Sequence, residues 1–128
     1  MPIRELQTLL RTMEPLLREG SYVFVSAAGL PADVSPESTV WEPEGLSAVI
    51  TRDDADRLGL GYDFVAAWIT LTVDSALDAV GLTAAVSTAL AGAGVSCNVI
   101  AGLRHDHLLV PVAAANDALR TLRELAAG

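Results

Sequence analysis

The sequence predicts an α+β fold, because its apolar residues follow two different periodicities in turn. In residues 82–93 and 115–126 they recur every three or four positions, as on one face of an amphipathic helix. In residues 68–73 and 95–102 two sets of side chains alternate, as on the two faces of a strand. With 128 residues, 52% of them hydrophobic, the chain can bury the core of one compact unit or of two small interlocked ones.

The first half of the chain predicts one helix followed by three strands. Residues 3–17 carry apolar side chains at steps of three and four, which predicts an amphipathic helix that Pro15 bends or ends. Residues 22–25 are aromatic or β-branched and predict a buried strand. Residues 39–41 and 46–50 predict two strands joined by a tight turn.

Turn and capping residues complete the first half. Residues 28–38 contain two prolines and several turn formers, which predicts a loop. Thr51 and Asp54 form a capping-box pattern that opens a short helix ending at Gly59. The first half therefore reads α-β-β-β-α.

The second half predicts a β-α-β-β-α order. Its elements are a strand at residues 64–73, a helix at 82–93, strands at 95–101 and 108–110, and a helix at 115–126. This order is one strand short of a complete β-α-β-β-α-β unit. Since the first half has a strand to spare, we expect the two halves to interlock.

Charge and composition exclude several classes of function. Eight basic residues against sixteen acidic ones give a net charge of -8 without a basic cluster, so nucleic acid is not an expected partner. The apolar runs are too short to span a bilayer, and the first residues do not resemble a signal peptide. A single cysteine, Cys97, excludes an intramolecular disulfide. We therefore expect a cytoplasmic protein that does not contact a membrane.

The densest polar group of the sequence is His105-Asp106-His107. In an extended segment the two imidazoles point to one face and the carboxylate to the other. Two histidines are too few for a tight zinc site. Two interpretations stay open: a turn in which Asp106 accepts backbone hydrogen bonds, or contact with a ligand. Metal binding or acid-base catalysis is a weaker third, because no Ser or Cys nucleophile has an identifiable base.

Residues 75–83, SALDAVGLT, join a predicted strand to a predicted helix. Gly81 permits close approach of the backbone, and free N–H groups at a helix start attract a carboxylate. By spacing alone, a turn that only packs is the more common case. Asn98 places an amide on an otherwise apolar strand, where it bonds neighbouring backbone or faces a ligand or a subunit boundary. Cys97 lies on the opposite face and is interpreted as a buried, inert thiol.

The stretch ITLTVDSALDAVGLTAAVSTALAGAGVSCNVIAGLRHDHLLVP resembles the ACT-domain signature of a group of small bacterial proteins. EGLSAVI and SYVF resemble the N-terminal half of the same group, so the resemblance covers nearly the whole chain. It implies a ferredoxin-like ACT fold with antiparallel sheets and helices on one face. The two interlocked ACT-like subdomains would be residues 1–62 and 63–128.

The resemblance also implies a binding site for an amino acid or similar effector between paired units. Such sites occur in modules that regulate metabolic enzymes and in eukaryotic cytosolic arginine sensors, which this chain distantly resembles. The implied ligand-binding residues are Ser75, Ala79, Val80, Gly81, Leu82, Thr83, Asn98, Val99, Ile100 and Asp106. The group commonly has SSLEAVG and two aromatics before HDH, whereas this chain has SALDAVG and Leu103-Arg104. Arg104 could neutralise Asp106 and favour an α-carboxylate instead of a cationic ligand.

The expected function is therefore a regulatory sensor module without catalysis, cofactor or metal, working as a homodimer. The alternative is a protein–protein interaction module with no small ligand, for which open strand edges and alanine-rich helix faces are suited. An enzyme is not expected, because the sequence contains no nucleophile with a base, no phosphate loop and no complete metal set.

Overall fold

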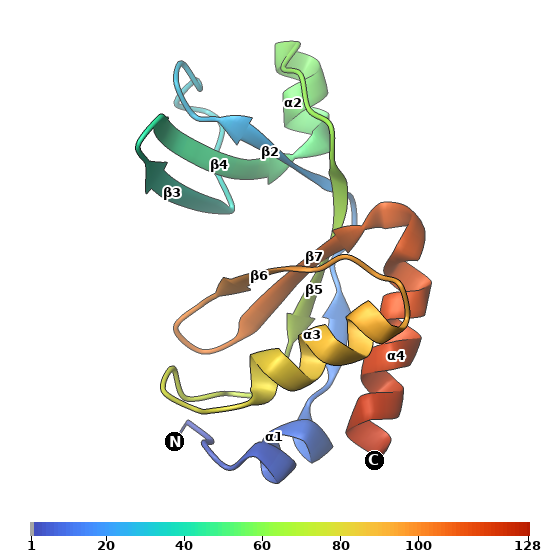
Figure 1. Ribbon diagram of the computed structural model, residues 1–128. Coiled ribbons are helices and arrows are strands. Elements are labelled where there is room, and N and C mark those ends of the chain that lie inside the picture. Colours follow the sequence, from blue (N-terminus) through green and yellow to red (C-terminus); the bar gives the residue numbers. More distant parts are fainter. Residues whose placement is uncertain (1) are drawn as a thin grey trace. The chain divides into compact units, whose positions relative to one another are not determined.

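The computed structural model describes residues 2–128, which contain four α-helices, one 3-10 helix and seven strands (Figure 1). The described chain packs as two compact units. Unit 1 combines the N-terminal residues up to Glu19 with Ala67–Gly128, and unit 2 is Gly20–Ala66. Segments from both ends of the sequence therefore share one core.

Unit 1 contains an antiparallel sheet and three α-helices. Its elements are α1 (Leu6–Thr12), β1 (Pro15–Leu17), most of β5 (Val65–Leu71), α3 (Leu82–Gly92), β6 (Asn98–Ala101), β7 (Asp106–Pro111), the 3-10 helix Val112–Ala114 and α4 (Ala115–Ala127). In this unit β5 pairs with β1 and β7, and β6 pairs with the other side of β7. The mixed α+β architecture and antiparallel pairing confirm the predicted fold class.

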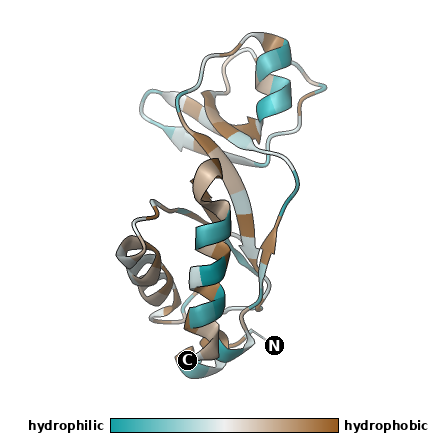
Figure 2. Cartoon of the chain, turned by 90° about the vertical axis from the view of Figure 1, so that its right-hand side faces the viewer, coloured by the Kyte–Doolittle hydropathy of each residue, from teal (hydrophilic) through white to brown (hydrophobic). Residues whose placement is uncertain are grey.

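The three helices of unit 1 cover one face of its sheet. Leu9 of α1, Val86 of α3 and Leu122 of α4 are buried in the same core as Ile69 of β5 and Leu108 of β7. In Figure 2 the ribbon of α4 carries both hydrophilic and hydrophobic colours, as expected of an amphipathic helix. The three- and four-residue spacing of apolar positions produces this division, because it places them on one side of each helix.

The first helix ends earlier than its apolar spacing suggests. It stops at Thr12, and residues 15–17 form β1, which pairs antiparallel with β5 from Pro15↔Leu71 to Leu17↔Ile69. The expectation that Pro15 ends the helix is confirmed, since proline has no N–H to continue it. The continuation of the helical pattern through Leu17 is wrong, because that backbone is used by the sheet.

The strand predicted at residues 95–101 begins only at Asn98. Val95 donates its N–H to the Leu90 carbonyl at 2.9 Å, so the start of this segment closes the end of α3. Gly94, at a φ of 74°, makes the turn that this closure needs.

Unit 2 consists of a small sheet with one helix. Its elements are β2 (Tyr22–Ser26), β3 (Ser38–Glu42), β4 (Gly45–Thr51), α2 (Arg52–Leu58) and the first residues of β5. The strand order is β3-β4-β2-β5. The predicted strands and the loop with two prolines are confirmed. The predicted cap of α2 is also confirmed: Thr51 Oγ1 accepts from the Asp54 N–H at 3.2 Å, and Gly59 ends the helix in the left-handed conformation.

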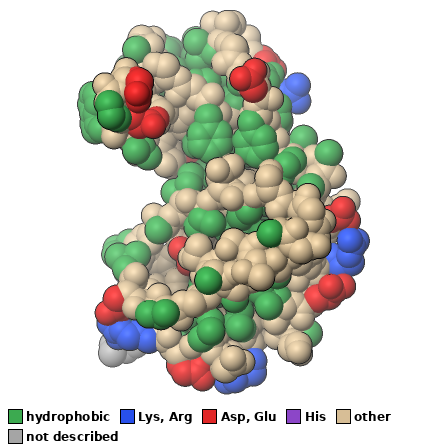
Figure 3. Space-filling view, in the orientation of Figure 1, with side chains coloured by type: hydrophobic (Ala, Val, Ile, Leu, Met, Phe, Trp, Pro, Cys, Tyr) green, Lys and Arg blue, Asp and Glu red, His purple; other side chains and the backbone are tan. Residues whose placement is uncertain are grey.

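Within residues 2–128, no helix is both long and apolar enough to cross a membrane. On the face of the molecule shown in Figure 3, basic side chains lie singly beside acidic ones and form no basic patch.

Candidate functional site

A pocket with a volume of about 170 Å³ lies in unit 1, where the loop before α3 meets the start of β7. It is lined by Ser75, Ala76, Leu77, Ala79, Gly81, Leu82, Thr83, Ala101 and Asp106. The structure thus brings together two segments that the sequence analysis singled out separately, the loop with Gly81 and the acid of the HDH group.

One wall of the pocket is the start of α3. Gly81 is the N-cap residue of this helix, at a φ of 107°, and no side chain caps the helix start. The first N–H groups of a helix have no intrahelical partner and carry partial positive charge. Leu82 and Thr83 belong to this first turn and line the pocket. This wall is suited to an anion such as a carboxylate.

Gly81 is required at this position for two independent reasons. Its φ lies in the range that favours glycine, and a Cβ on it would lie 3.0 Å from Leu6 Cδ2. A side chain here would therefore strain the backbone and require the end of the Leu6 side chain to shift by a few tenths of an ångström.

Another part of the pocket wall carries the carboxylate of Asp106. This residue begins β7 and pairs with Ala101 of β6, which also lines the pocket. The buried hydroxyl of Ser75 lies 3.4 Å from Asp106 Oδ2 and donates to it weakly. The pocket therefore offers a negative group as well as the helix start.

Arg104 and Asp106 do not form a salt bridge in the described part of the chain. The carbonyl oxygen of Arg104 accepts from the Ser75 N–H at 3.2 Å. The turn that precedes β7 thus binds the backbone of the pocket loop, and the Asp106 carboxylate has no ion-pair partner among the described residues.

The two histidines beside Asp106 have separate structural partners. His105 Nδ1 lies 3.1 Å from the Val73 carbonyl and donates to it. His107 Nδ1 lies 3.3 Å from Trp68 Nε1, which donates, and 2.9 Å from Thr70 Oγ1. No group of three His, Cys, Asp or Glu residues suited to a metal ion occurs in the described part of the chain.

His107 is held as a neutral acceptor. Burial lowers the pKa of His107, and the positive charge of Arg18 and the neighbouring His105 lower it further, against the opposite effect of Asp106. The Arg18 guanidinium lies 4.2 Å from the ring centre of Trp68, whose ring also contacts His107. This group supports β7 from the face opposite Asp106.

The other predicted residues lie outside the pocket. Val80 is 83% exposed in the loop before α3. Asn98, Val99 and Ile100 belong to β6, the last strand in the order of the sheet. Cys97 is half-buried, and burial raises the pKa of its thiol.

Sequence reasoning missed Ala76, Leu77 and Ala101 as lining residues. Ala76 and Leu77 lie within the candidate segment at residues 75–83, and this position in the loop is the sequence feature that could have identified them. Ala101 enters the pocket only through its pairing with Asp106, and strand register is not readable from small apolar residues.

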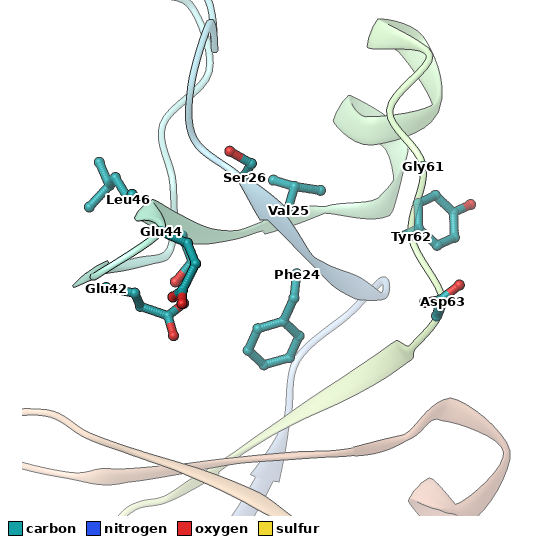
Figure 4. A pocket seen from close by; sticks show the side chains of 11 residues that line it. Phe24, Val25, Ser26, Glu42, Glu44, Leu46, Gly61, Tyr62 and Asp63 are labelled. Atoms are coloured by element: carbon teal, nitrogen blue, oxygen red, sulfur yellow. The ribbon is translucent and has the colours of Figure 1, made fainter.

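Unit 2 contains a second, more open groove of about 570 Å³ (Figure 4). It is lined by Phe24, Val25, Ser26, Glu42, Glu44, Gly45, Leu46, Ser47, Gly61, Tyr62 and Asp63. The Glu42 and Glu44 side chains lie near one another beside the Phe24 ring in Figure 4. The Tyr62 hydroxyl already bonds Asp56 at 2.7 Å. The lining of the groove includes carboxylates but no helix start. It therefore does not offer the two opposite charges that line the pocket in unit 1.

Comparisons with known proteins agree on one family. A family model described as an ACT domain matches residues 1–67, and a second ACT-domain model matches residues 64–124. A solved Vibrio cholerae protein of unknown function, described as a possible transport protein, is 45% identical with a TM-score of 0.84; the match covers 94% of this chain and 95% of that one. No curated protein matches this chain.

More distant structures share the fold alone. An Agrobacterium tumefaciens protein is 22% identical with a TM-score of 0.63, and the match covers 89% of each chain. The ligand-free regulatory subunit of aspartate kinase from Thermus thermophilus is 11% identical with a TM-score of 0.65, and the match covers 90% of this chain and 97% of that one.

Proposed function

Because this chain belongs to the ACT-domain family, whose members are regulatory modules rather than catalysts, we propose that it binds a small α-amino acid in the pocket of unit 1. One observation carries the proposal. An uncapped helix start and the Asp106 carboxylate, which has no ion-pair partner in the described chain, line the same small pocket. A zwitterion presents the complementary charges.

In the proposed complex, the carboxylate of the amino acid binds at the first turn of α3, near Leu82 and Thr83. Its ammonium group binds Asp106, with the Ser75 hydroxyl beside that acid. Each charge-assisted hydrogen bond of this kind contributes about 1.5–3 kcal/mol. The volume of about 170 Å³ lies below the range of roughly 300–1,000 Å³ typical of pockets for drug-sized ligands, which favours a small side chain.

Thermal unfolding in the presence of single compounds tests the proposal. The panel contains the proteinogenic amino acids, nucleotides, and divalent metals including zinc and nickel. A ligand at 100 times its Kd adds about 2.7 kcal/mol to the free energy of unfolding, which raises the Tm of a chain of this size by several degrees. A rise with one or a few small amino acids supports the proposal. A rise with zinc or nickel alone contradicts it.

The second candidate is a protein–protein interaction module without a small ligand. It is favoured by β3, the last strand of the unit 2 sheet, on which Trp41 is 80% exposed and Val40 is also exposed. An open strand edge with exposed apolar side chains is a surface to which another chain adds a strand. The absence of a Tm rise with every compound favours this candidate.

The proposal includes a homodimer in the cytoplasm. Asn98, Val99 and Ile100 lie on the open strand β6, so they would reach a ligand only through pairing with a second copy. Static light scattering tests the dimer: a monomeric mass at micromolar concentration contradicts it. The cytoplasmic location rests on the single Cys97, which forms no disulfide within the described residues.

A further inference from the structure

The first residues of the chain are bound to the pocket loop. Residues 3–6, termed the N-terminal strap, run beside residues 74–81, termed the pocket loop. Ile3 donates its N–H to the Asp74 carbonyl at 2.8 Å and accepts from the Ala76 N–H at 2.9 Å. These two bonds form an isolated parallel bridge between Ile3 and Ser75, one of the residues that line the pocket.

Two side chains of the strap extend this contact along the loop. Arg4 Nε lies 2.9 Å from Asp78 Oδ1, and both side chains are exposed, so this ion pair adds little stability. Leu6 lies directly behind Gly81, with Cδ2 at 3.0 Å from the position a Cβ would take. The strap thus contacts the loop at its beginning, its middle and the N-cap of α3.

The first residues of the pocket loop are also held by Ser75, whose N–H donates to the Arg104 carbonyl at 3.2 Å, but the rest of the loop has few other restraints. Between residues 76 and 80 its one internal backbone bond among the described residues joins the Ala79 N–H to the Ala76 carbonyl at 3.0 Å. The Leu77 and Val80 side chains are exposed. A segment with few buried contacts opens at low free energy unless a neighbour holds it.

The strap itself is firmly placed. It leads into α1, whose residues Leu9 and Met13 are buried in the core of unit 1. Glu5, within the strap, caps α1 by accepting from the Thr8 N–H at 2.8 Å. The core therefore fixes the strap, and the strap in turn restrains the loop.

We infer that the N-terminal strap positions the pocket loop, and that its residues set effector affinity without touching the effector. The second clause rests on the proposed function, while the first does not. Because a loop that is ordered before binding costs less conformational entropy on binding, loosening the strap weakens the complex. By linkage, an effector in the pocket tightens the strap by the same factor.

Leu6→Ala tests the inference, with Leu10→Ala as its matched control. Both leucines are partly buried on α1 and pack on the same core. They differ in that the Leu6 side chain lies next to Gly81, where a Cβ at position 81 would meet it. Amide hydrogen exchange is measured on each full-length chain without ligand. We expect exchange at Ala76 and Ala79 to be about tenfold faster in Leu6→Ala and nearly unchanged in Leu10→Ala. In Leu6→Met, which keeps a side chain of similar volume behind Gly81, exchange at these two amides should stay about as slow as in the wild-type chain.

Three outcomes separate the alternatives. Unchanged exchange at the loop amides in Leu6→Ala overturns the inference, and so does equal acceleration in both alanine variants, which marks a general loss of stability. Acceleration confined to Leu6→Ala supports it. Calorimetric titration with L-alanine and L-serine then tests affinity, which should fall about three- to tenfold in Leu6→Ala alone. If the wild-type chain binds no amino acid while exchange responds as expected, the strap stands and the proposed function fails.

Discussion

At the residue scale, the proposed recognition depends on the charge of Asp106. Its side-chain contact within the described residues is the Ser75 hydroxyl at 3.4 Å, which leaves the carboxylate without a compensating cation. A neutral partner of this kind orients an acid but does not offset its charge. An ammonium group would offset the charge. The effect of this charge can be tested separately from the shape of the side chain.

Asp106→Asn removes that charge and keeps the shape of the side chain. We expect amino-acid affinity measured by calorimetry to fall about tenfold or more, since a charge-assisted bond becomes a neutral one, while the Tm without ligand changes little. Asp117→Asn is the control, because Asp117 is exposed on α4 and pairs with Arg120 away from the pocket. Equal affinity in the wild-type and Asp106→Asn chains would remove this residue from the site.

His107 makes stability depend on pH. Its pKa is lowered in the folded chain, so between that value and the unfolded value of about 6.5 the unfolded state binds more protons. The contribution of His107 is therefore fully present above pH 6.5 and is lost as the pH falls through this window. Protonation of Nδ1 would also remove the acceptor of the hydrogen bond that the Trp68 N–H donates to it.

Urea unfolding between pH 7.5 and 5 measures this effect. The free energy of unfolding should fall toward low pH more steeply in the wild-type chain than in His107→Gln. His105→Gln is the control: burial is the largest cause of the lowered pKa of His107 and His105 is a smaller one, so most of the wild-type slope should persist in it. Identical slopes in the wild-type and His107→Gln chains would contradict the prediction.

At the element scale, the start of α3 is built from backbone alone. Gly81 has no side chain that could cap the helix, so no side chain accepts a hydrogen bond from the N–H groups of the first turn, which lies at the pocket. A Ser or Asp at this position would cap the helix but fill the proposed carboxylate site. The local stability of the helix and the availability of its N-terminus are thus opposed.

Gly81→Ala tests that element. The positive φ and the contact with Leu6 should together cost about 1–3 kcal/mol in the free energy of unfolding, and displacement of the loop should weaken amino-acid binding. Gly94→Ala is the control, because Gly94 also has a positive φ but a Cβ there meets no atom within 4 Å. It should lose stability with little change in affinity. Equal affinity losses in the two variants would contradict a specific role for Gly81.

Local patterns predicted most of the elements, because helices and strands place their apolar side chains at fixed intervals. The patterns failed where distant backbone decides the structure. Pro15–Leu17 form β1 because they pair with β5. Val95 lies outside the predicted strand because its N–H bonds the Leu90 carbonyl at the end of α3. In the site, spacing and resemblance marked the loop and Asp106. The strap was not predicted, since nothing local to Ile3 indicates its bridge to Ser75.

At the scale of the whole molecule, each unit has a core of its own. Val23 and Ile50 are buried in the core of unit 2, whereas Ile69 and Leu108 are buried in that of unit 1. An amino acid bound in the pocket contacts residues of unit 1. Its binding energy therefore stabilises unit 1 directly.

Native-state hydrogen exchange with and without a bound amino acid checks this expectation. Saturating ligand at 100 times its Kd should slow exchange at Ile69 and Leu108 by up to about one hundredfold. Exchange at Val23 and Ile50 should slow much less. Equal protection of all four amides would mean that the two units open as one, and would contradict the prediction.

The division of unit 1 between the two ends of the chain has a consequence for its synthesis on the ribosome. Unit 2 is continuous in sequence, so its residues are all available once Ala66 has emerged. Leu9 of the nascent chain must wait for Leu119 and Leu122 of α4 before its core can close. The core of unit 1 is therefore completed last, and a ribosome stalled before α4 would present a folded unit 2 and an unfinished unit 1.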